Sequence, residues 1–359
     1  MGRPLHRISG LSAGRKPGAA PVRSILVVET WNIGDVVLAI PFLAELRAIF
    51  PEASISLLAR EHAREILAHT DLVDDVITID LPYTTGSGGY RPSQYMGAEL
   101  RAAFKGMRER EFDLGFESRM DPRGKLVLAL SGAARRVAYD YGGANWLLTD
   151  PIPVTDRARH KNEDWMGLLA PFGGPRGVPL PQLTVSAGEA AWARDWLAAH
   201  RIDDAATLIA VHPGASSDSK RWPIERFAAV VRALVARRHT CVLAIRSPDG
   251  SGGELAQIPG VAWVQPDLRQ LLALLARADV LLCNDSGPMH LAAALGTRTV
   301  AIFHTHAARE FAPLGEGHRM LQPAGQPAVE VIPPPADALL SIGVPGVLDA
   351  INQTLGVHA

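Results

Sequence analysis

From residue 24 onward, short aliphatic and β-branched runs alternate with longer stretches in which apolar residues recur at helical spacing. This alternation is typical of β-α-β units and predicts a parallel sheet. The first strand is predicted over residues 24–29 (SILVVE). The first helix is predicted over residues 35–50 (DVVLAIPFLAELRAIF), with Pro51 just beyond its end. The chain is therefore expected to have an α/β fold.

The alternation runs twice along the chain, before and after a segment dense in Pro and Gly, residues 171–181 (PFGGPRGVPLP). Neither a helix nor a central strand can pass through such a segment, so an interdomain boundary is placed there. In the first series, further strands are predicted over residues 55–58, 76–79, 114–116 and 136–139, and helices over residues 62–69, 98–110, 124–130 and 161–169. In the second series, strands are predicted over residues 207–211, 240–245, 280–283 and 299–303, and helices over residues 189–199, 224–237, 268–277, 290–295 and 344–355.

The length of 359 residues exceeds the size at which a single hydrophobic core usually keeps growing, so two domains are expected. We predict a flexible N-terminal tail (1–23), a first Rossmann-like domain (24–175) and a second Rossmann-like domain (176–342). A C-terminal helix (343–359) could pack back on the first domain. Residues 81–97 (LPYTTGSGGYRPSQYMG) are too long for a plain connector and form a candidate lid.

Composition narrows the class of protein further. Hydrophobic residues make up 47% and charged residues 20% of the chain, which is ordinary for a globular protein. A net charge of -1 argues against binding to nucleic acid or to polyanions in general. Cys241 and Cys283 lie in separate apolar runs and are interpreted as core thiols. No apolar run is long enough to span a bilayer or to act as a secretion signal, so a cytoplasmic protein with at most peripheral membrane contact is expected.

The loop after the first predicted strand, residues 29–35 (ETWNIGD), is the first candidate for chemistry. In parallel sheets ligands bind at the carboxyl ends of the strands. Asp35 opens the following helix and could be a general base in an interdomain cleft, or a plain N-terminal helix cap. The loop lacks the GxGxxG of a dinucleotide site, and no GxxxxGK[ST] loop occurs in the chain, so dehydrogenase and P-loop functions are disfavoured.

Two loops of the second half suit an anion. Residues 212–222 (HPGASSDSKRW) combine Gly, small hydroxyls and Lys220 at a strand-to-helix junction, as a phosphate site requires, although a polar loop with an exposed lysine would look the same. Residues 284–290 (NDSGPMH) place backbone donors and a hydroxyl at another helix N-terminus, although an ordinary cap with Pro288 in the first turn fits too. Taken alone, His290 would more often be a structural histidine than a catalyst.

These loops belong to three longer segments: ILVVETWNIGDVVLAIPFLAELRAIFP, VHPGASSDSKRWPIERFAAVV and DVLLCNDSGPMHLAAALGTRTVAIF. In this order and at these separations the segments resemble the heptosyltransferase-like glycosyltransferases of family 9. The resemblance covers most of the chain from Ser24 on. It implies the GT-B fold, in which two Rossmann-like domains face each other across a cleft. The first domain would then take the acceptor and the second the nucleotide sugar.

The resemblance also implies a role for individual residues. Asp35 would take the proton from an acceptor hydroxyl, whose oxygen attacks the anomeric carbon with inversion and expels the nucleoside diphosphate. Lys220 would contact the diphosphate, with Ser216 and Ser217 resembling its hydrogen-bonding partners. The element that would hold the donor sugar and phosphates consists of Asp285, Ser286, Gly287 and His290.

The family donor is typically ADP-heptose, so the implied function is bacterial lipopolysaccharide biosynthesis. The acceptor would be a hydroxyl of a lipid-linked oligosaccharide such as the lipopolysaccharide core, or of a soluble small molecule. No DxD sequence for a metal-bound diphosphate occurs, so metal-independent activity without a cofactor is expected. A nucleotide-sugar epimerase or hydrolase, and a non-catalytic nucleotide-sugar-binding protein, stay open as alternatives.

Two departures from the family pattern concern substrate contacts. After the last core strand the family commonly shows Gly-Pro-Thr, whereas this chain has Phe303, His304, Thr305 and His306. Members that act on membrane lipids carry clustered basic residues in the first half, whereas the candidate lid has Arg91 alone. Arg119 and Arg123 could line an acceptor pocket or lie on the solvated surface.

Overall fold

The computed structural model describes residues 21–79, 81, 97–156, 159–177, 179–304, 307–323 and 338–356. Most of the predicted tail (1–20) lies outside the described residues, as does most of the candidate lid (82–96) with Arg91. The same holds for residues 305–306 of the segment that departs from the family pattern.

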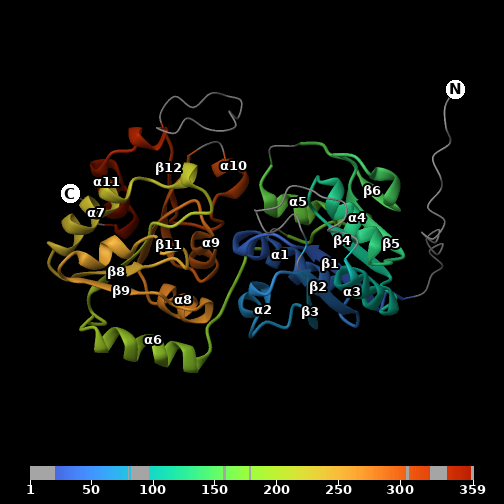
Figure 1. Cartoon of the computed structure of the whole chain (residues 1–359), viewed down its shortest axis with the longest axis horizontal. Helices are drawn as coiled ribbons and strands as arrows, with labels where there is room; N and C mark the ends of the chain where they lie inside the picture. The colour runs from blue at the N-terminus through green and yellow to red at the C-terminus, as the bar shows by residue number, and fades with distance from the viewer. Residues whose placement is uncertain are drawn as a thin grey trace.

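The first half is built on one parallel sheet of six strands in the order β3-β2-β1-β4-β5-β6. Its strands are β1 (Ser24–Glu29), β2 (Ser54–Ala59), β3 (Asp75–Thr78), β4 (Leu114–Glu117), β5 (Arg135–Tyr139) and β6 (Asp150–Ile152). Its helices are α1 (Ile33–Ile49), α2 (His62–Ile66), α3 (Ala98–Glu109), α4 (Pro122–Leu130) and α5 (Lys161–Gly167), with short 3-10 turns at Asn145–Leu147 and Ala170–Phe172. The half occupies the right of Figure 1.

The second half repeats this design with the order β12-β11-β10-β7-β8-β9. Its strands are β7 (Thr207–His212), β8 (Thr240–Ile245), β9 (Val261–Val264), β10 (Val280–Asn284), β11 (Arg298–Ile302) and β12 (Arg319–Leu321). Its helices are α6 (Ala187–Ala199), α7 (Ile224–Val235), α8 (Leu268–Leu275), α9 (Gly287–Ala294), α10 (Ala307–Phe311) and α11 (Val344–Leu355), with 3-10 turns at Asp218–Lys220, Gly253–Gln257 and Ala338–Ser341.

The two sheets have the same topology. Counted in chain order within each half, the strands of both follow the Rossmann order 3-2-1-4-5-6. The order reverses between β1 and β4 in one sheet and between β7 and β10 in the other. Ligands of such sheets bind beyond the carboxyl ends of the strands at these switch points. The predicted α/β architecture of two Rossmann-like halves is confirmed.

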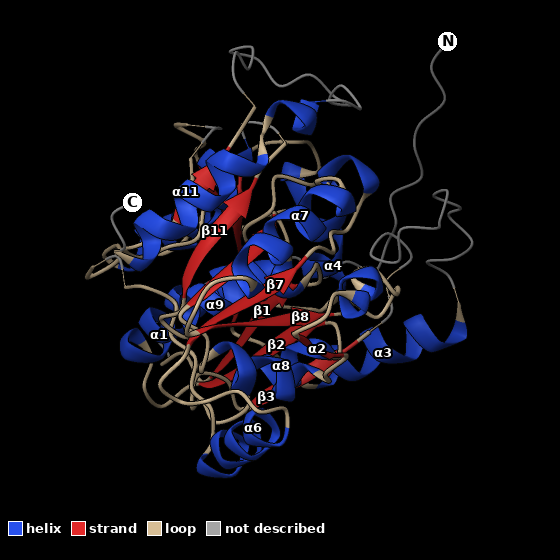
Figure 2. Cartoon of the chain, turned by 90° about the vertical axis from the view of Figure 1, so that its left-hand side faces the viewer, coloured by secondary structure: helices blue, strands red, loops and turns tan. Residues whose placement is uncertain are grey.

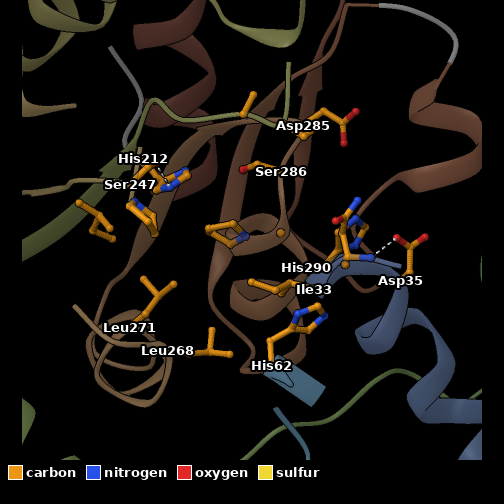
Figure 3. Close-up of a pocket in the computed structure, with 18 of the residues that line it drawn as sticks. Ile33, Asp35, His62, His212, Ser247, Leu268, Leu271, Asp285, Ser286 and His290 are labelled. Atoms are coloured by element: carbon orange, nitrogen blue, oxygen red, sulfur yellow. Dashed lines mark hydrogen bonds between the residues drawn. The ribbon is translucent and has the colours of Figure 1, made fainter. Parts of the chain in front are cut away.

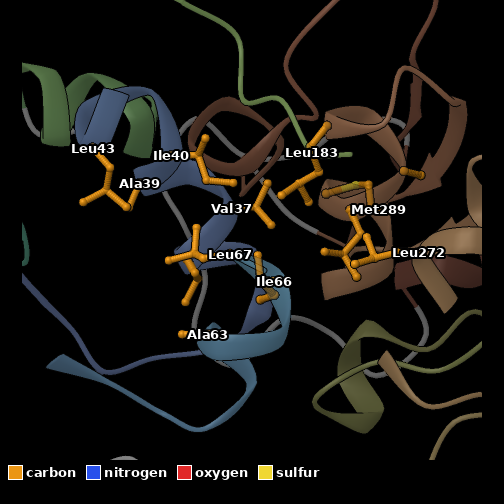
Figure 4. Packing of buried hydrophobic residues seen from close by; sticks show 14 of the residues in the cluster. Val37, Ala39, Ile40, Leu43, Ala63, Ile66, Leu67, Leu183, Leu272 and Met289 are labelled. Atoms are coloured by element: carbon orange, nitrogen blue, oxygen red, sulfur yellow. The ribbon is translucent and has the colours of Figure 1, made fainter. Parts of the chain in front are cut away.

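An apolar seam joins the halves. In it α1 contacts α9 and α2 contacts α8. Figure 4 shows Val37 and Ile40 of α1 and Ile66 of α2 facing Leu272 of α8 and Met289 of α9. All five side chains are buried, and they belong to one hydrophobic cluster that includes residues of both sheets. Viewed along the long axis, the strands of the two sheets overlap (Figure 2). The seam therefore fixes where the two switch points lie relative to one another.

The sequence analysis did not predict the short edge strands β6, β9 and β12 or the short helix α10. β6 and β12 each have three residues, and β6 contains Pro151, which a strand accepts at a sheet edge because no hydrogen bond is needed on its outer side. The predicted boundary between residues 175 and 176 falls between the turn at Ala170–Phe172 and α6.

Within the described residues, the C-terminal helix α11 packs on the second half and not, as the sequence analysis had allowed, on the first domain. α11 contacts α7, β10, β11 and β12, and its Val347 and Ile351 are buried in the core of the second half. Its apolar face is therefore covered by the sheet of the second half. Within the described ranges, no helix has the length and apolar character needed to cross a membrane.

Candidate active site between the two halves

A pocket of about 660 Å³ lies where the two switch points face each other (Figure 3). Its walls come from the loops after β1, β4, β7, β8 and β10 and from the first turns of α1, α2, α8 and α9. This volume is in the range of small-molecule sites. The pocket brings together seven residues predicted from the sequence: Asp35, Ser216, Lys220, Asp285, Ser286, Gly287 and His290.

Asp35 lies in the first turn of α1 and faces the pocket. The backbone N–H of Asn32, the N-cap residue, donates to its Oδ2 at 3.1 Å, and the Arg119 guanidinium forms an ion pair with its Oδ1. The side chain is 13% exposed. A carboxylate has about four acceptor positions, so these two contacts leave room for a hydroxyl donor. Asp35 therefore caps its helix and is also placed for chemistry.

Arg119 and Arg123, the two candidate acceptor-side arginines, differ in position. Arg119 lines the pocket, and its guanidinium lies 4.8 Å from the centre of the Trp31 ring. Arg123 lies 5.8 Å from the same ring, on the side of α4, and pairs with the carboxylate of Asp121. Both guanidinium groups thus lie near the Trp31 ring, but of the two only Arg119 is among the pocket-lining residues.

On the second-half wall, Lys220 forms an ion pair with Asp285 at 2.6 Å. Asp285 is buried, and the lysine side chain is 27% exposed. Asn284, the first residue of the second predicted loop, joins it to the first: its side-chain amide donates to the carbonyl of Pro213 at 2.7 Å, and its Oδ1 accepts from the backbone N–H of Trp222 at 3.1 Å. This cross-link holds the Lys220 loop against the start of α9.

The start of α9 is a helix N-terminus without an acidic residue. Ser286 is the N-cap, but its hydroxyl donates back to the carbonyl of Asn284 at 3.1 Å instead of capping the helix. Gly287 begins the helix, and a Cβ atom there would lie 2.9 Å from the Cβ of Ile33. The first backbone donors of α9 are therefore not capped by their own N-cap side chain, which suits an anion.

His290 joins the two walls. A Cβ atom on Gly34 would lie only 2.5 Å from its ring, so the backbone of α1 reaches the imidazole directly. Burial lowers the pKa of His290 to about 4, against which the charges of Asp285 and Asp35 act only in part. The ring is accordingly neutral at pH 7 and can donate one hydrogen bond and accept another.

Ser216 and Ser217 separate in the structure. Ser216 lines the pocket, whereas Ser217 is exposed and its hydroxyl shares a hydrogen bond of 3.0 Å with Ser219. A second polar pair joins the ends of β7 and β8. Nε2 of the buried His212, the last residue of β7, and the hydroxyl of Ser247, just after β8, are 2.8 Å apart. Burial lowers the pKa of His212 to about 4, so this ring too is neutral at pH 7.

With this geometry established, the relatives of the chain identify its family. The family model described as glycosyltransferase family 9 (heptosyltransferase) matches residues 100–330. The chain belongs to this family.

Individual relatives agree with the family match over most of the chain. Lipopolysaccharide heptosyltransferase 2 of Escherichia coli (strain K12) is 25% identical over 317 residues, which cover 83% of this chain and 87% of the relative. The solved structure of E. coli ADP-heptose lps heptosyltransferase II has a TM-score of 0.74 at 22% identity and covers 93% of this chain and 98% of its own. E. coli heptosyltransferase WaaC with ADP-2-deoxy-2-fluoro heptose has a TM-score of 0.69 at 16% identity, with 92% and 99% covered. The predicted GT-B fold and glycosyltransferase class are confirmed.

Several lining residues of this family 9 glycosyltransferase were missed by the sequence analysis. They share a position just beyond the carboxyl end of a strand or at a helix start: His62, Glu65, Arg246, Ser247, Asp267 and Leu268. Arg246 and Ser247 directly follow a strand that was predicted correctly at residues 240–245, so extending the carboxyl-end rule to every strand would have found them. The same rule applied to the strand predicted at residues 55–58 would have pointed to His62, whereas Glu65 lies further along α2 and carries no such local signal. Among the described residues, no group of three or more His, Cys, Asp or Glu side chains is arranged to hold a metal ion.

Proposed function

We propose that this glycosyltransferase transfers a heptose from ADP-heptose to a hydroxyl of the lipopolysaccharide core, with inversion at the anomeric carbon and without a metal ion. The observation that carries the proposal is the position of Asp35, whose carboxylate faces Lys220 and the first turn of α9 across one pocket. A base on one wall and an anion-binding surface on the other are what a transfer from a sugar diphosphate requires.

The donor is assigned to the second half, residues 176–342. A solved structure with the same fold is that of E. coli heptosyltransferase WaaC with ADP-2-deoxy-2-fluoro heptose, and a lipopolysaccharide heptosyltransferase is among the relatives. In this chain Lys220 would move from Asp285 to the diphosphate, while the backbone donors of α9, with Ser286 and Gly287, receive phosphate oxygens. Ser216 lines the same wall. His290 and Asp285 would hydrogen-bond the sugar, and Ser217 would need a loop movement to reach it.

The acceptor is assigned to the first half, residues 24–175. Its hydroxyl proton passes to Asp35 while the hydroxyl oxygen forms a bond to the anomeric carbon from the face opposite the diphosphate. The bond between that carbon and the diphosphate oxygen breaks, and ADP leaves with the electron pair. Because attack and departure occur on opposite faces, the anomeric configuration inverts.

Metal independence is supported by the groups that can neutralise the departing diphosphate. Lys220 supplies a full positive charge and the N-terminus of α9 supplies a partial one. The chain contains no DxD sequence to hold a cation on the diphosphate. We place the reaction in the cytoplasm, with at most peripheral contact with the membrane that carries the lipid-linked acceptor.

The test is transfer by the purified protein from ADP-heptose to heptose-deficient lipopolysaccharide core, with and without a chelator. ADP release matched by an acceptor mass increase of one heptose is expected in both conditions, and the anomeric configurations of donor and product should be opposite by NMR. ADP release without a glycosylated acceptor would favour a hydrolase, and donor isomerisation without ADP release an epimerase. Donor binding without turnover would favour a binding protein. Transfer only to soluble sugars would show that the acceptor is a soluble small molecule and not the lipopolysaccharide core. Activity that is lost on chelation and restored by a divalent ion would contradict the metal-free mechanism.

A further inference from the structure

Two buried glutamates lie behind the Asp35 wall of the pocket. Glu29 is the last residue of β1 and Glu117 the last residue of β4, and each is 2% exposed. The two strands are neighbours in the sheet, with Val28 opposite Glu117. Fully buried glutamates are rare in proteins unless a partner compensates their charge. The position of this pair beneath the loops that carry Asp35 and Arg119 therefore requires an explanation.

Each glutamate holds one of these loops. Oε1 of Glu29 accepts a hydrogen bond from the backbone N–H of Trp31 at 3.0 Å, and Oε1 of Glu117 accepts one from the backbone N–H of Arg119 at 2.9 Å. The first turn of α4 packs directly on the second carboxyl group, because a Cβ atom on Gly124 would lie 2.5 Å from Oε1 of Glu117. The course of both loops, and so the meeting of Asp35 with Arg119, depends on these two side chains.

The charges around the pair do not balance if both glutamates are ionised. Asp35 of α1 and Arg119 face Glu29, while Glu29, Arg119 and Asp121 face Glu117. Lys125 of α4 also acts on Glu117, but its ammonium group is held by the carbonyl of Gly143 at 3.0 Å and by the side chain of Asn145 at 2.5 Å. The Arg119 guanidinium thus faces the carboxyl groups of Asp35, Glu29 and Glu117 together, and Asp164 acts on it as well.

Burial resolves the imbalance by favouring the neutral acids. Loss of water, followed by the charge of Asp35, raises the pKa of Glu29 to about 8. Loss of water likewise raises the pKa of Glu117 well above its usual range. Oε2 of Glu117 is buried and has no hydrogen-bond partner within the described part of the chain, which a carboxylate oxygen would tolerate poorly.

We propose that Glu29 and Glu117 are positioning residues that act as neutral carboxylic acids: they fix the loops that carry Asp35 and Arg119, and they leave the Arg119 charge to Asp35. The inference rests on the proposed role of Asp35 as the base. It adds that the ionisation of Glu29 changes the proton affinity of Asp35. An ionised Glu29 draws Arg119 away from Asp35 and adds a negative charge beside it, and both effects increase the proton affinity of Asp35.

The first test compares Glu29→Gln, which is neutral at every pH and keeps an acceptor for the Trp31 N–H, with Glu29→Ala, which removes that acceptor. In the wild type, kcat should rise about three- to tenfold through an inflection near pH 8 as Glu29 ionises. Glu29→Gln should match the wild-type kcat at pH 7 and lack the rise. Glu29→Ala should lose about 10- to 100-fold at each pH because the base is misplaced.

The outcomes that overturn the proposal are distinct. A rise near pH 8 that persists in Glu29→Gln assigns the inflection elsewhere, and an absent rise in the wild type contradicts the neutral state at pH 7. Full activity of Glu29→Ala would show that the Glu29 side chain is not needed to hold the loop that carries Asp35. If Glu29→Ala does not fold, the comparison of Glu29→Gln with the wild type still tests whether the inflection near pH 8 belongs to Glu29.

The second test does not depend on transfer activity. The infrared spectrum of the unliganded protein at pH 7 should contain the carbonyl band of protonated carboxylic acids. Difference spectra between the wild type and each variant should show that Glu29→Gln and Glu117→Gln reduce this band. Glu163→Gln, at an exposed position in the first turn of α5, is the matched control and should leave the band unchanged. A wild-type spectrum without the band overturns the proposal even if heptose transfer is observed. A normal band in a protein without transfer would instead reject the proposed function.

Discussion

The two helices whose first turns face each other across the pocket, α1 and α9, differ in electrostatic character. Both are largely buried, and both have in the first turn a glycine that allows close approach: Gly34 meets the His290 ring, and Gly287 meets Ile33. α1 carries the acidic Asp35 in its first turn, and this side chain satisfies the N–H of Asn32. α9 carries no acid there.

This difference shows how one backbone feature can support two tasks. A helix N-terminus has unsatisfied N–H groups and a partial positive charge. In α1 the charge and the Asn32 N–H favour a carboxylate that belongs to the protein and stays in place. In α9 the N-cap hydroxyl points elsewhere, so the same features remain for an anion that arrives with the donor.

The largest expected effect is on the α1 side. Asp35→Asn keeps an acceptor for the Asn32 N–H but cannot take a proton, so turnover should fall about 10²- to 10⁴-fold while donor affinity is unchanged. Steady-state rates and calorimetric titration with ADP-heptose measure the two quantities. Glu163→Gln, an acid at the same helical position in α5, should have the wild-type rate. An unchanged rate in Asp35→Asn would remove the base from the proposed mechanism.

The α9 side should instead show a pH dependence of stability. The pKa of His290 is about 4 in the folded chain and about 6.5 when unfolded. Between these values the unfolded state binds a proton that the folded state refuses, so the folded state loses stability as the pH falls from about 6.5 to about 4. The full loss from this residue is about 3 kcal/mol.

Urea unfolding of wild type and His290→Gln at pH 7.5 and pH 5 measures this effect. The variant should show the smaller change between the two pH values, because glutamine stays neutral. His200→Gln, at an exposed position after α6, should behave like the wild type. Equal pH dependence in the wild type and His290→Gln would show that the ring is not held neutral.

Loss of the lysine on the donor wall should weaken donor binding. Lys220→Ala removes a charge-assisted contact of about 1.5 to 3 kcal/mol, so ADP-heptose affinity should fall about 10- to 150-fold, together with kcat/KM. The substitution also leaves Asp285 without its lysine partner. The double variant Lys220→Ala/Asp285→Asn relieves that unpaired charge and should still bind the donor weakly. Recovery of affinity in the double variant would mean that Lys220 serves Asp285 and not the diphosphate.

The smallest effect concerns the close approach of the two helices. Gly34→Ala places a Cβ against the His290 ring and should lower the free energy of unfolding by about 1 to 3 kcal/mol. Adding His290→Ala should recover part of this loss, which a double-mutant cycle in urea would measure. Gly346→Ala in α11, where a Cβ meets no atom within 4 Å, is the control and should not destabilise. Additive losses at Gly34 and His290 would contradict the contact.

Most of the architecture could be predicted from local sequence, since period and turn residues act over short distances. The strands over residues 24–29 and 240–245 were predicted to the residue. α9 was expected to begin at His290 but begins three residues earlier, because Pro288 is tolerated in a first turn whose N–H groups need no helical partner. The edge strands β6, β9 and β12 are too short for an alternating pattern to be recognised in the sequence.

The charges of the site could be predicted only in part. The loops with Asp35, Lys220 and Asp285 follow predicted strands, so their convergence follows from the topology of parallel sheets. The ion pair of Asp35 with Arg119 joins residues 84 positions apart, and the burial of Glu29 depends on strands from both sides. A carboxyl group at a strand end looks the same in sequence whether it is solvated or buried and neutral.

The apolar seam has a consequence for how the molecule unfolds. Val37 of α1 and Met289 of α9 belong to one continuous core, so neither half can lose its structure without exposing the apolar surface of the other. Melting should therefore be a single cooperative transition. A nucleotide that touches only the second half would raise the melting temperature of both, and it would slow hydrogen exchange in the first sheet as well.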